Sequence, residues 1–259
     1  MSIKIAVAGK GGVGKTTVSA ALARSLRGAG ERVLAVDADP NNCLGRALGF
    51  PEEKLAGIIP LSEMKDELAA RAGRGEGGGF FALNPPVADL LDEYRLEHDG
   101  IALLVMGTVD EPGAGCVCPE SAVLKALLRH LAGLEEVSLV ADMEAGLEHL
   151  GRGTAQHIGG LLIVAEPTPP SARTAARIAR LALGLGLRLP GLVWNKAPDG
   201  QVSEGLEPYL EGLPVLAMLP LDPLVAGSEA VPASGAFVQA VEALRGLLPS
   251  SPAPESREA

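Results

Sequence analysis

A glycine-rich segment near the start of the chain has the composition and spacing of a phosphate-binding loop. Residues 9–16 read Gly-Lys-Gly-Gly-Val-Gly-Lys-Thr and fit the pattern G-x-x-x-x-G-K-[ST]. Glycines let backbone N–H groups surround phosphate oxygens, and a helix that starts at the loop adds its partial positive charge. Lys15 can reach the β- and γ-phosphates, and the Thr16 hydroxyl can coordinate Mg²⁺. The residues expected to hold the nucleotide at this loop are Gly11, Gly12, Val13, Gly14, Lys15, Thr16 and Thr17.

Such a loop needs a strand before it and a helix after it, and the sequence predicts both. Residues 3–8 form a short apolar run typical of a buried strand, and residues 16–27 carry apolar side chains at helical spacing. Repetition of this strand-then-helix pattern predicts an α/β fold, a single doubly wound, mostly parallel sheet with helices on both faces. The further strands are expected at 33–36, 101–106, 137–141, 161–165, 192–194 and 215–219, and the helices at about 119–132, 171–185, 203–211 and 236–248.

The organisation of the chain follows from this pattern. A domain built on the phosphate loop (P-loop) is predicted over residues 1–248, because 259 residues with 47% hydrophobic content suffice for one large core. Residues 51–100 interrupt the alternation with a charged helical piece and a glycine-rich stretch, and are interpreted as an excursion without its own core. The polar, proline-rich residues 249–259 are expected to be a disordered tail.

Charge and cysteine content exclude several classes of function. The formal net charge of −10 argues against a broad basic face for nucleic acid or anionic lipid. No apolar run reaches the length of a membrane span, and three cysteines are too few for a disulfide framework. We therefore expect a cytoplasmic protein with neither a nucleic-acid partner nor a membrane partner.

Carboxylates follow two of the predicted strands at the edge where doubly wound sheets bind ligands. The segment Asp37-Ala38-Asp39-Pro40-Asn41 follows the second strand, and Asp142-Met143-Glu144-Ala145-Gly146 follows the strand at 137–141. Asp37 has two interpretations of equal weight, a member of the site or a structural cap. The second segment resembles Walker B with switch II, and this resemblance implies that Asp142 serves the Mg²⁺ shell through water; the capping of a following helix is the alternative.

A pair of cysteines lies between a predicted strand and a predicted helix. Cys116 and Cys118 precede Pro119, which suits the first position of a helix. A helix N-terminus lowers the pKa of a thiol, and the thiolate is the form that binds metal. Two copies of this C-x-C segment across a two-fold axis would supply the four ligands of a tetrahedral site. The alternative is a pair of buried or redox-active cysteines. Cys43 is expected to be a buried core thiol.

The loop sequence KGGVGKT resembles the deviant Walker A motif of the MinD, ParA and nitrogenase iron-protein superfamily. In that family the extra lysine, here Lys10, contacts nucleotide across a dimer interface, so the resemblance implies ATP-dependent dimerisation. It also implies that Lys10 and Lys15 neutralise the phosphates and that Asp39 positions the attacking water. The remaining residues implied to bind nucleotide are Asp142, the Gly146 N–H, Asn195, Lys196 and the loop at Pro220. Residue 198 is proline where guanine recognition requires aspartate, which favours ATP over GTP.

Within that superfamily the chain resembles CooC-type nickel-insertion ATPases. The segments that carry the resemblance are GKGGVGKTT, VDADPNNCLG, GCVCPESAVLKALLRHL, ADMEAGLEHLGRGT and VAEPTPPSARTA. The resemblance implies that Cys116 and Cys118 bind the metal, one pair from each subunit of a nucleotide-promoted homodimer. It also implies delivery of Ni²⁺ to a client, either carbon monoxide dehydrogenase or a related acetyl-CoA synthase. Ligand chemistry alone does not select nickel, because four thiolates suit Zn²⁺ at least as well.

Two other functions fit parts of this pattern. A MinD- or ParA-like positioning ATPase would use the ATP dimer as a scaffold on membrane or DNA. The acidic composition and the polar C-terminal residues argue against that function. An iron–sulfur carrier of the same superfamily typically has C-x-x-C in a C-terminal segment, whereas this chain has C-x-C at 116–118.

Overall fold

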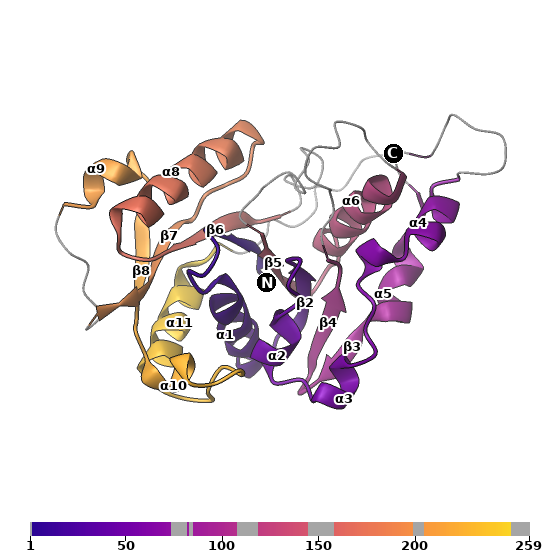
Figure 1. Cartoon of the computed structure of the whole chain (residues 1–259), viewed down its shortest axis with the longest axis horizontal. Helices are drawn as coiled ribbons and strands as arrows, with labels where there is room; N and C mark the ends of the chain where they lie inside the picture. Colours follow the sequence, from indigo (N-terminus) through magenta and orange to yellow (C-terminus); the bar gives the residue numbers. More distant parts are fainter. Residues whose placement is uncertain are drawn as a thin grey trace.

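A computed structural model shows a sheet flanked by helices on both faces (Figure 1). The structure describes residues 2–73, 82, 85–107, 119–144, 158–198 and 205–249, and at 119–120 it describes the backbone alone. Within these residues the sheet has eight strands. They are β1 (Lys4–Ala8), β2 (Arg32–Ala38), β3 (Leu96–His98), β4 (Ile101–Val105), β5 (Val137–Met143), β6 (Gly160–Ala165), β7 (Gly191–Ala197) and β8 (Val215–Pro220).

The order of the strands places β1 in the interior of the sheet. Neighbouring strands follow the order β3-β4-β2-β5-β1-β6-β7-β8, and every pair is parallel except β3 with β4. The chain goes from β1 to β2 on one side and later fills the other side with β6, β7 and β8. The direction of winding therefore changes next to β1, and ligands of open α/β sheets bind at such a point. The predicted doubly wound, mostly parallel α/β fold is confirmed.

Helices cover both faces of this sheet. One face carries α1 (Lys15–Gly28), α2 (Leu44–Leu48) and α11 (Ala236–Leu247), which contribute to one buried cluster. The other carries α4 (Lys65–Arg71), α5 (Ala88–Tyr94), α6 (Pro119–Ala132), α8 (Pro169–Gly184) and α9 (Glu207–Leu210), which contribute to a second cluster. The shorter elements are α3 (Glu52–Leu55), the 3₁₀ turn η1 (Leu61–Glu63) and α10 (Pro223–Ala226). None of the described helices is long and apolar enough to span a bilayer.

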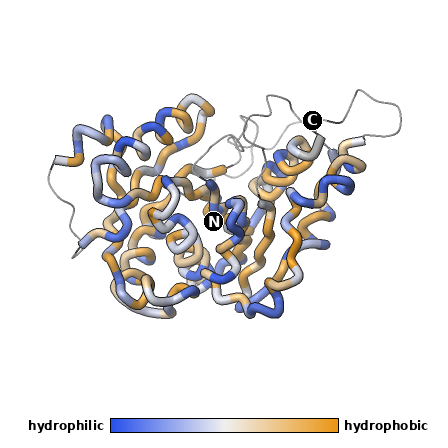
Figure 2. The backbone as a smooth tube through the Cα atoms, viewed as in Figure 1, coloured by the Kyte–Doolittle hydropathy of each residue, from blue (hydrophilic) through white to orange (hydrophobic). Residues whose placement is uncertain are grey.

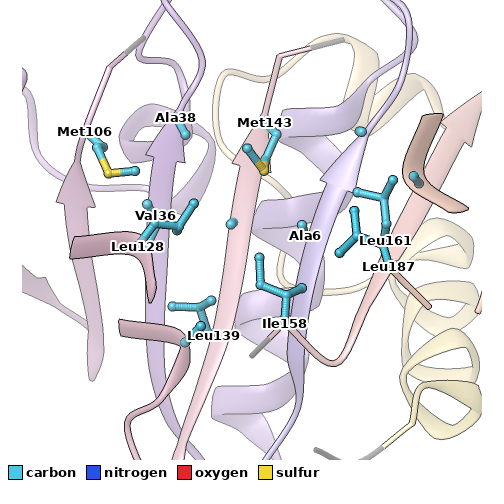
Figure 3. Packing of buried hydrophobic residues seen from close by; sticks show 14 of the residues in the cluster. Ala6, Val36, Ala38, Met106, Leu128, Leu139, Met143, Ile158, Leu161 and Leu187 are labelled. Carbon is cyan, nitrogen blue, oxygen red and sulfur yellow. The ribbon is translucent and has the colours of Figure 1, made fainter. Parts of the chain in front are cut away.

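Alternating side chains of the central strands supply both clusters. In β1, Ile5 and Val7 join the cluster under α1, whereas Ala6 and Ala8 join the opposite one. Figure 3 shows Ala6 packed in this opposite cluster with residues such as Leu139 and Leu161. Figure 2 shows the same division at the scale of the chain, with hydrophobic strands inside and hydrophilic residues on the outer helix surfaces. Both faces of β1 are therefore buried, which explains the continuous apolar sequence of its residues 5–8.

The predicted excursion at 51–100 does not lie wholly outside the sheet. Its last part forms β3, an antiparallel edge strand that the sequence analysis missed. Asp99 and Gly100 both have positive φ angles, 48° and 73°, and form the tight turn from β3 to β4. Leu61, Leu68 and Leu90 pack into the same cluster as the sheet.

Several predicted boundaries move by a few residues. Strands β5 and β7 are longer than expected, so that Asp142, Asn195 and Lys196 lie within strands rather than after them. Pro220 likewise ends β8. The helix expected at 203–211 is reduced to α9, because Gly205, with φ 91°, cannot continue a right-handed helix toward its N-terminal side. Residues 203–204 lie outside the described part, as do residues 250–259 of the predicted tail.

Truncation of a core leucine should measure the contribution of the cluster between the sheet and α6. Leu104 of β4 is fully buried, so Leu104→Ala is expected to lower the free energy of unfolding by about 2–5 kcal/mol through lost contacts and a residual cavity. Urea unfolding followed by circular dichroism measures the change. Leu183→Ala makes the same change at a side chain of α8 that is 61% exposed, and should stay within about 0.5 kcal/mol of the wild type. Equal losses in both variants would contradict the assignment of this core.

Candidate functional site

The phosphate loop joins β1 to α1 and is held by glycines at two points. A Cβ atom at Gly9 would lie 2.2 Å from the carbonyl oxygen of Val164 in β6, so only glycine allows this approach of the loop to the sheet. Gly14 precedes α1 with φ 90°, a conformation that favours glycine. The N-terminus of the 14-residue helix α1 therefore faces the loop, and its free N–H groups can bind phosphate oxygens.

Lys15 and two carboxylates meet at the carboxyl edge of the sheet. The Lys15 ammonium lies 3.6 Å from Asp39 Oδ2, and both side chains are almost entirely buried. Asp39 Oδ1 accepts hydrogen bonds from the Asn41 backbone N–H at 3.0 Å and from the Asn41 side-chain amide at 2.9 Å. Asp142 is fully buried in the adjacent strand β5, and its charge interacts with those of Lys15 and Asp39. The structure thus brings together three residues that the sequence analysis assigned to one site.

Asp142 has an unsatisfied oxygen that fits a hydrated Mg²⁺ ion. The Ser19 hydroxyl donates to Asp142 Oδ1 at 3.2 Å, whereas Oδ2 is buried with no hydrogen-bond partner among the described residues. A buried carboxylate oxygen without a partner is costly, and water bound to a divalent cation would satisfy it. Burial, together with the charge of Asp39, raises the pKa of Asp142 to about 6, against the opposing effects of Thr16, Lys15 and Ser19.

Asp37 is a cap for the segment that follows β2. Its Oδ2 accepts the Leu44 backbone N–H at 2.9 Å, at the start of α2, and its Oδ1 accepts the Asp39 N–H at 3.3 Å. Of the two interpretations made from sequence, the structure shows the capping role. Burial raises the pKa of Asp37 to about 7, the two N–H donors lower it, and the charges of Asp142 and Asp39 raise it.

A pocket of about 350 Å³ lies beside the loop and contains the residues predicted to bind the base. Asn195, Lys196 and Pro220 line this pocket, together with Gly12 and Gly14 of the phosphate loop and Thr17 of α1. The Asn195 amide donates to the Val13 carbonyl oxygen at 2.8 Å, so this buried side chain also fixes the loop. The apolar wall consists of Leu221, which belongs to the predicted loop at Pro220, and of Val225 and Phe237, which were not predicted from the sequence. Phe237 stands at the start of the predicted last helix, and no spacing rule connects it to the loop.

Lys196 connects the loop to a carboxylate that the sequence analysis did not select. Its ammonium donates to the Gly12 carbonyl oxygen at 2.6 Å and lies 2.7 Å from Glu166 Oε1, just beyond β6. Lys196 has a positive φ of 56°, which accompanies an irregular register between β7 and β8. The loop is therefore held by side chains from two neighbouring residues of β7.

The prediction of a buried Cys43 is wrong. Cys43 is exposed, and its thiol donates to the Asn41 carbonyl oxygen at 3.3 Å. The sequence pattern failed because the residues after β2 form a surface loop, and the helix that follows begins its buried side at Leu44. Desolvation and the charges of Asp37 and Asp39 raise the pKa of the Cys43 thiol, so the thiolate is disfavoured.

The two cysteines predicted to bind nickel lie in a part of the chain that the structure does not describe. Cys116, Cys118 and Gly146 lie outside the described residues, so their assigned roles stay predictions. In the part of the chain that the structure describes, no group of three or more His, Cys, Asp or Glu side chains is placed to hold a metal ion.

Comparisons with known proteins agree with this geometry. The model of the CobQ/CobB/MinD/ParA nucleotide binding domain family matches residues 4–231. The carbon monoxide dehydrogenase accessory protein CooC of Rhodospirillum rubrum is 47% identical over 195 residues, 75% of this chain and 74% of that protein. The chain is a CooC-type member of the CobQ/CobB/MinD/ParA family. An uncharacterized ATP-binding protein of Methanocaldococcus jannaschii is 43% identical over 88% of each chain.

Solved structures of this family share the fold. The septum site-determining protein MinD of Pyrococcus horikoshii, solved with Mg-ADP, matches with a TM-score of 0.63 at 21% identity over 95% of both chains. A ParA family ATPase of Chlorobium tepidum matches with a TM-score of 0.67 at 18% identity, over 94% of this chain and 98% of that one. At these identities the likeness shows the fold alone. Together with its family and its ATP-binding relatives, the phosphate loop makes this CooC-type protein an ATPase.

The buried carboxylates predict how stability depends on pH without nucleotide. The pKa values of Asp37 and Asp142 rise from 3.8 to about 7 and about 6 on folding, so the folded state retains protons that the unfolded state has lost. The contribution of these two carboxyl groups to stability is greatest below their pKa in the unfolded state. It is lost as the pH rises through their pKa values in the folded state. We expect the urea midpoint of the protein without Mg²⁺ and nucleotide to fall between about pH 5 and about pH 8, and Asp142→Asn to flatten this decline. Asp66→Asn, at an exposed position, is the matched control and should leave the decline unchanged. A midpoint that rises over this pH range in the wild type would refute the expectation.

Proposed function

We propose that this CooC-type ATPase is a nickel metallochaperone, which binds Ni²⁺ between two subunits and uses ATP to deliver it to a nickel enzyme. The observation that carries the proposal is the Cys116-Val117-Cys118 segment in a chain that is 47% identical to a carbon monoxide dehydrogenase accessory protein. The proposed client is carbon monoxide dehydrogenase or a related acetyl-CoA synthase. Nickel is the cargo of the reaction, and ATP is its energy source.

Dimerisation is proposed to depend on Lys10. This lysine is exposed in the single chain, and its side chain makes no hydrogen bond or ion pair with any described residue. Lys15, in contrast, is buried beside Asp39 at the start of α1. The two lysines of the loop therefore have different environments, which supports different roles. Lys15 would bind the phosphates of its own subunit, and Lys10 would reach the nucleotide of the partner subunit, as an arginine finger does in trans.

The chemistry at the phosphates is hydrolysis of ATP to ADP and inorganic phosphate. The N–H groups of the loop and the Lys15 ammonium would bind the phosphate oxygens and compensate the charge that develops on the transferred group. Asp39 accepts hydrogen bonds at this edge and would orient the attacking water. Thr16 and Asp142 would hold Mg²⁺, which when bound neutralises part of the phosphate charge. Asn195 and the apolar wall at Phe237 would bind the base.

The cysteine pair is proposed to supply half of a tetrahedral thiolate site. Two sulfurs on one chain leave the coordination of a metal incomplete, and a second copy related by two-fold symmetry completes it. Metal binding and dimerisation would then favour each other. Nickel, rather than zinc, is proposed because of the resemblance to CooC, since thiolate ligands alone do not distinguish the two ions.

Loss of the cysteine thiols should abolish the metal site while leaving the nucleotide site intact. Cys116→Ser/Cys118→Ser is expected to lose the tight Ni²⁺ binding of the wild type in equilibrium dialysis, because serine does not replace thiolate as a soft ligand. Cys43→Ser is the matched control, since it removes a thiol outside the pair and should leave the Ni²⁺ stoichiometry unchanged. Equal nickel binding by the wild type and the double variant would eliminate the proposal.

Removal of Lys10 should separate nucleotide binding from dimerisation. We expect Lys10→Ala to bind ATP within about tenfold of the wild-type affinity but to lose ATP-dependent dimerisation, measured by sizing chromatography with a non-hydrolysable analogue. ATP turnover should fall by about 10³-fold or more if the lysine acts as an arginine finger does. Lys15→Ala should instead lose nucleotide binding itself. A Lys10→Ala protein that dimerises normally would contradict the proposed role.

A further inference from the structure

We propose that the main-chain carbonyl group of Asp37 couples the nucleotide site to the cysteine segment, and that Gly107 is a positioning residue at the start of that segment. The inference rests on the proposed function, because it concerns the regulation of the same metal site. It goes beyond that function by naming the contacts through which the nucleotide would act.

Asp37 holds the ends of two different segments. Its carbonyl oxygen accepts hydrogen bonds from the backbone N–H groups of Met106 at 2.8 Å and Gly107 at 3.1 Å, just beyond β4. Its carboxylate accepts the N–H groups of Asp39 and Leu44, which bound the loop after β2. Asp37 is fully buried, so these four bonds form away from water, where their loss is costly. Asp37 therefore links the loop at 39–44 to residues 106 and 107, which follow β4. If the loop moves, these two residues must either hold it in place or move with it.

Only glycine fits at position 107. Its φ is 69°, and a Cβ atom there would lie 2.3 Å from Ser62 Oγ and 3.0 Å from Pro60 Cβ. The Ser62 N–H donates to the Met106 carbonyl oxygen at 3.0 Å. The backbone at 106–107 is thus fixed to Asp37 by its N–H groups and to the segment around Ser62 by its carbonyl group. The chain continues directly from Gly107 to the segment that contains Cys116 and Cys118.

Bound nucleotide is expected to change the contacts of the loop at 39–44. In the structure, Asp39 is paired with Lys15 at 3.6 Å. A bound triphosphate competes for the same ammonium group, because its charge is greater than that of one carboxylate. Asp39 would then lose its ion pair with Lys15, and the loop at 39–44 could rearrange around the attacking water. Since the two sites are linked, the metal would affect nucleotide affinity by the same factor as the nucleotide affects metal affinity.

Thiol alkylation of the full-length protein tests this coupling without requiring a bound metal. Cleavage after lysine and arginine places Cys43 on one peptide and Cys116 with Cys118 on another, so mass spectrometry can follow the two segments separately. In the metal-free wild type, a non-hydrolysable ATP analogue should change the iodoacetamide rate at Cys116 and Cys118 by about fivefold or more relative to ADP. In Gly107→Ala this change should shrink to within about twofold, while Cys43 still responds to nucleotide.

Gly186→Ala is the matched control. Gly186 has a similar positive φ of 81°, but a Cβ atom there meets nothing within 4 Å, so the variant imposes the same backbone strain without a clash. It should respond to nucleotide as the wild type does. A wild type without any nucleotide effect at Cys116 and Cys118, or a Gly107→Ala protein with the full effect, overturns the coupling.

Two further measurements keep the result unambiguous. Amide hydrogen exchange in the wild type should show that nucleotide changes the protection of Met106 and Gly107, and unchanged protection overturns the coupling even if Gly107→Ala does not fold.

Ni²⁺ binding by the wild type is measured in parallel. If the thiols respond to nucleotide but Ni²⁺ does not bind, the coupling stands and the nickel function fails. If Ni²⁺ binds but the thiols do not respond, the nickel function stands and the coupling fails.

Discussion

Negative charge confined at one edge of a buried sheet is the constraint on which the site depends. Besides burial, the charge of Asp39 raises the pKa values of Asp37 and Asp142, and Lys15 is a cation that interacts with Asp39 and Asp142. A buried charge needs hydrogen-bond or ion-pair partners. Here backbone N–H groups and two hydroxyl groups supply only some of the hydrogen bonds that the three carboxylates can accept. The remaining deficit, an unpartnered oxygen of Asp142, falls where a nucleotide-bound cation is expected. The protein without ligand is therefore poised to gain stability from its substrate.

The fold explains why these groups converge. Parallel strands end at the same edge, and β1 lies between β5 and β6, so the phosphate loop emerges beside the ends of several strands at once. Side chains within β7 and just beyond β6 then support the loop from the other direction, through Asn195, Lys196 and Glu166. One half of the sheet provides the carboxylates and the other half provides the base pocket. The phosphate loop is the part that both halves share.

Sequence patterns predicted the features that depend on local spacing. The loop at 9–16, the strands of the central sheet and Asp39 and Asp142 follow from short motifs and buried apolar runs. Contacts between distant segments left no such signal, so the partnership of Lys196 with Glu166 and the wall at Phe237 were missed. Strand β3 was missed although Asp99-Gly100 is a hairpin signal, because its three residues are too few to show alternation. Cys43 was misjudged because hydrophobic neighbours in sequence do not determine which face a loop residue presents.

The buried indole of Trp194 has a practical consequence. The chain contains a single tryptophan, and it lies in β7 immediately before Asn195, with only 2% of its surface exposed. Its ring packs into the core on the side of the sheet away from α1, while the next residue along the strand holds the phosphate loop. When the indole is excited selectively, emission from the unlabelled protein therefore has one source, and that source is attached to the strand that supports the base pocket. The molecule thus carries its own spectroscopic reporter of movements in that strand.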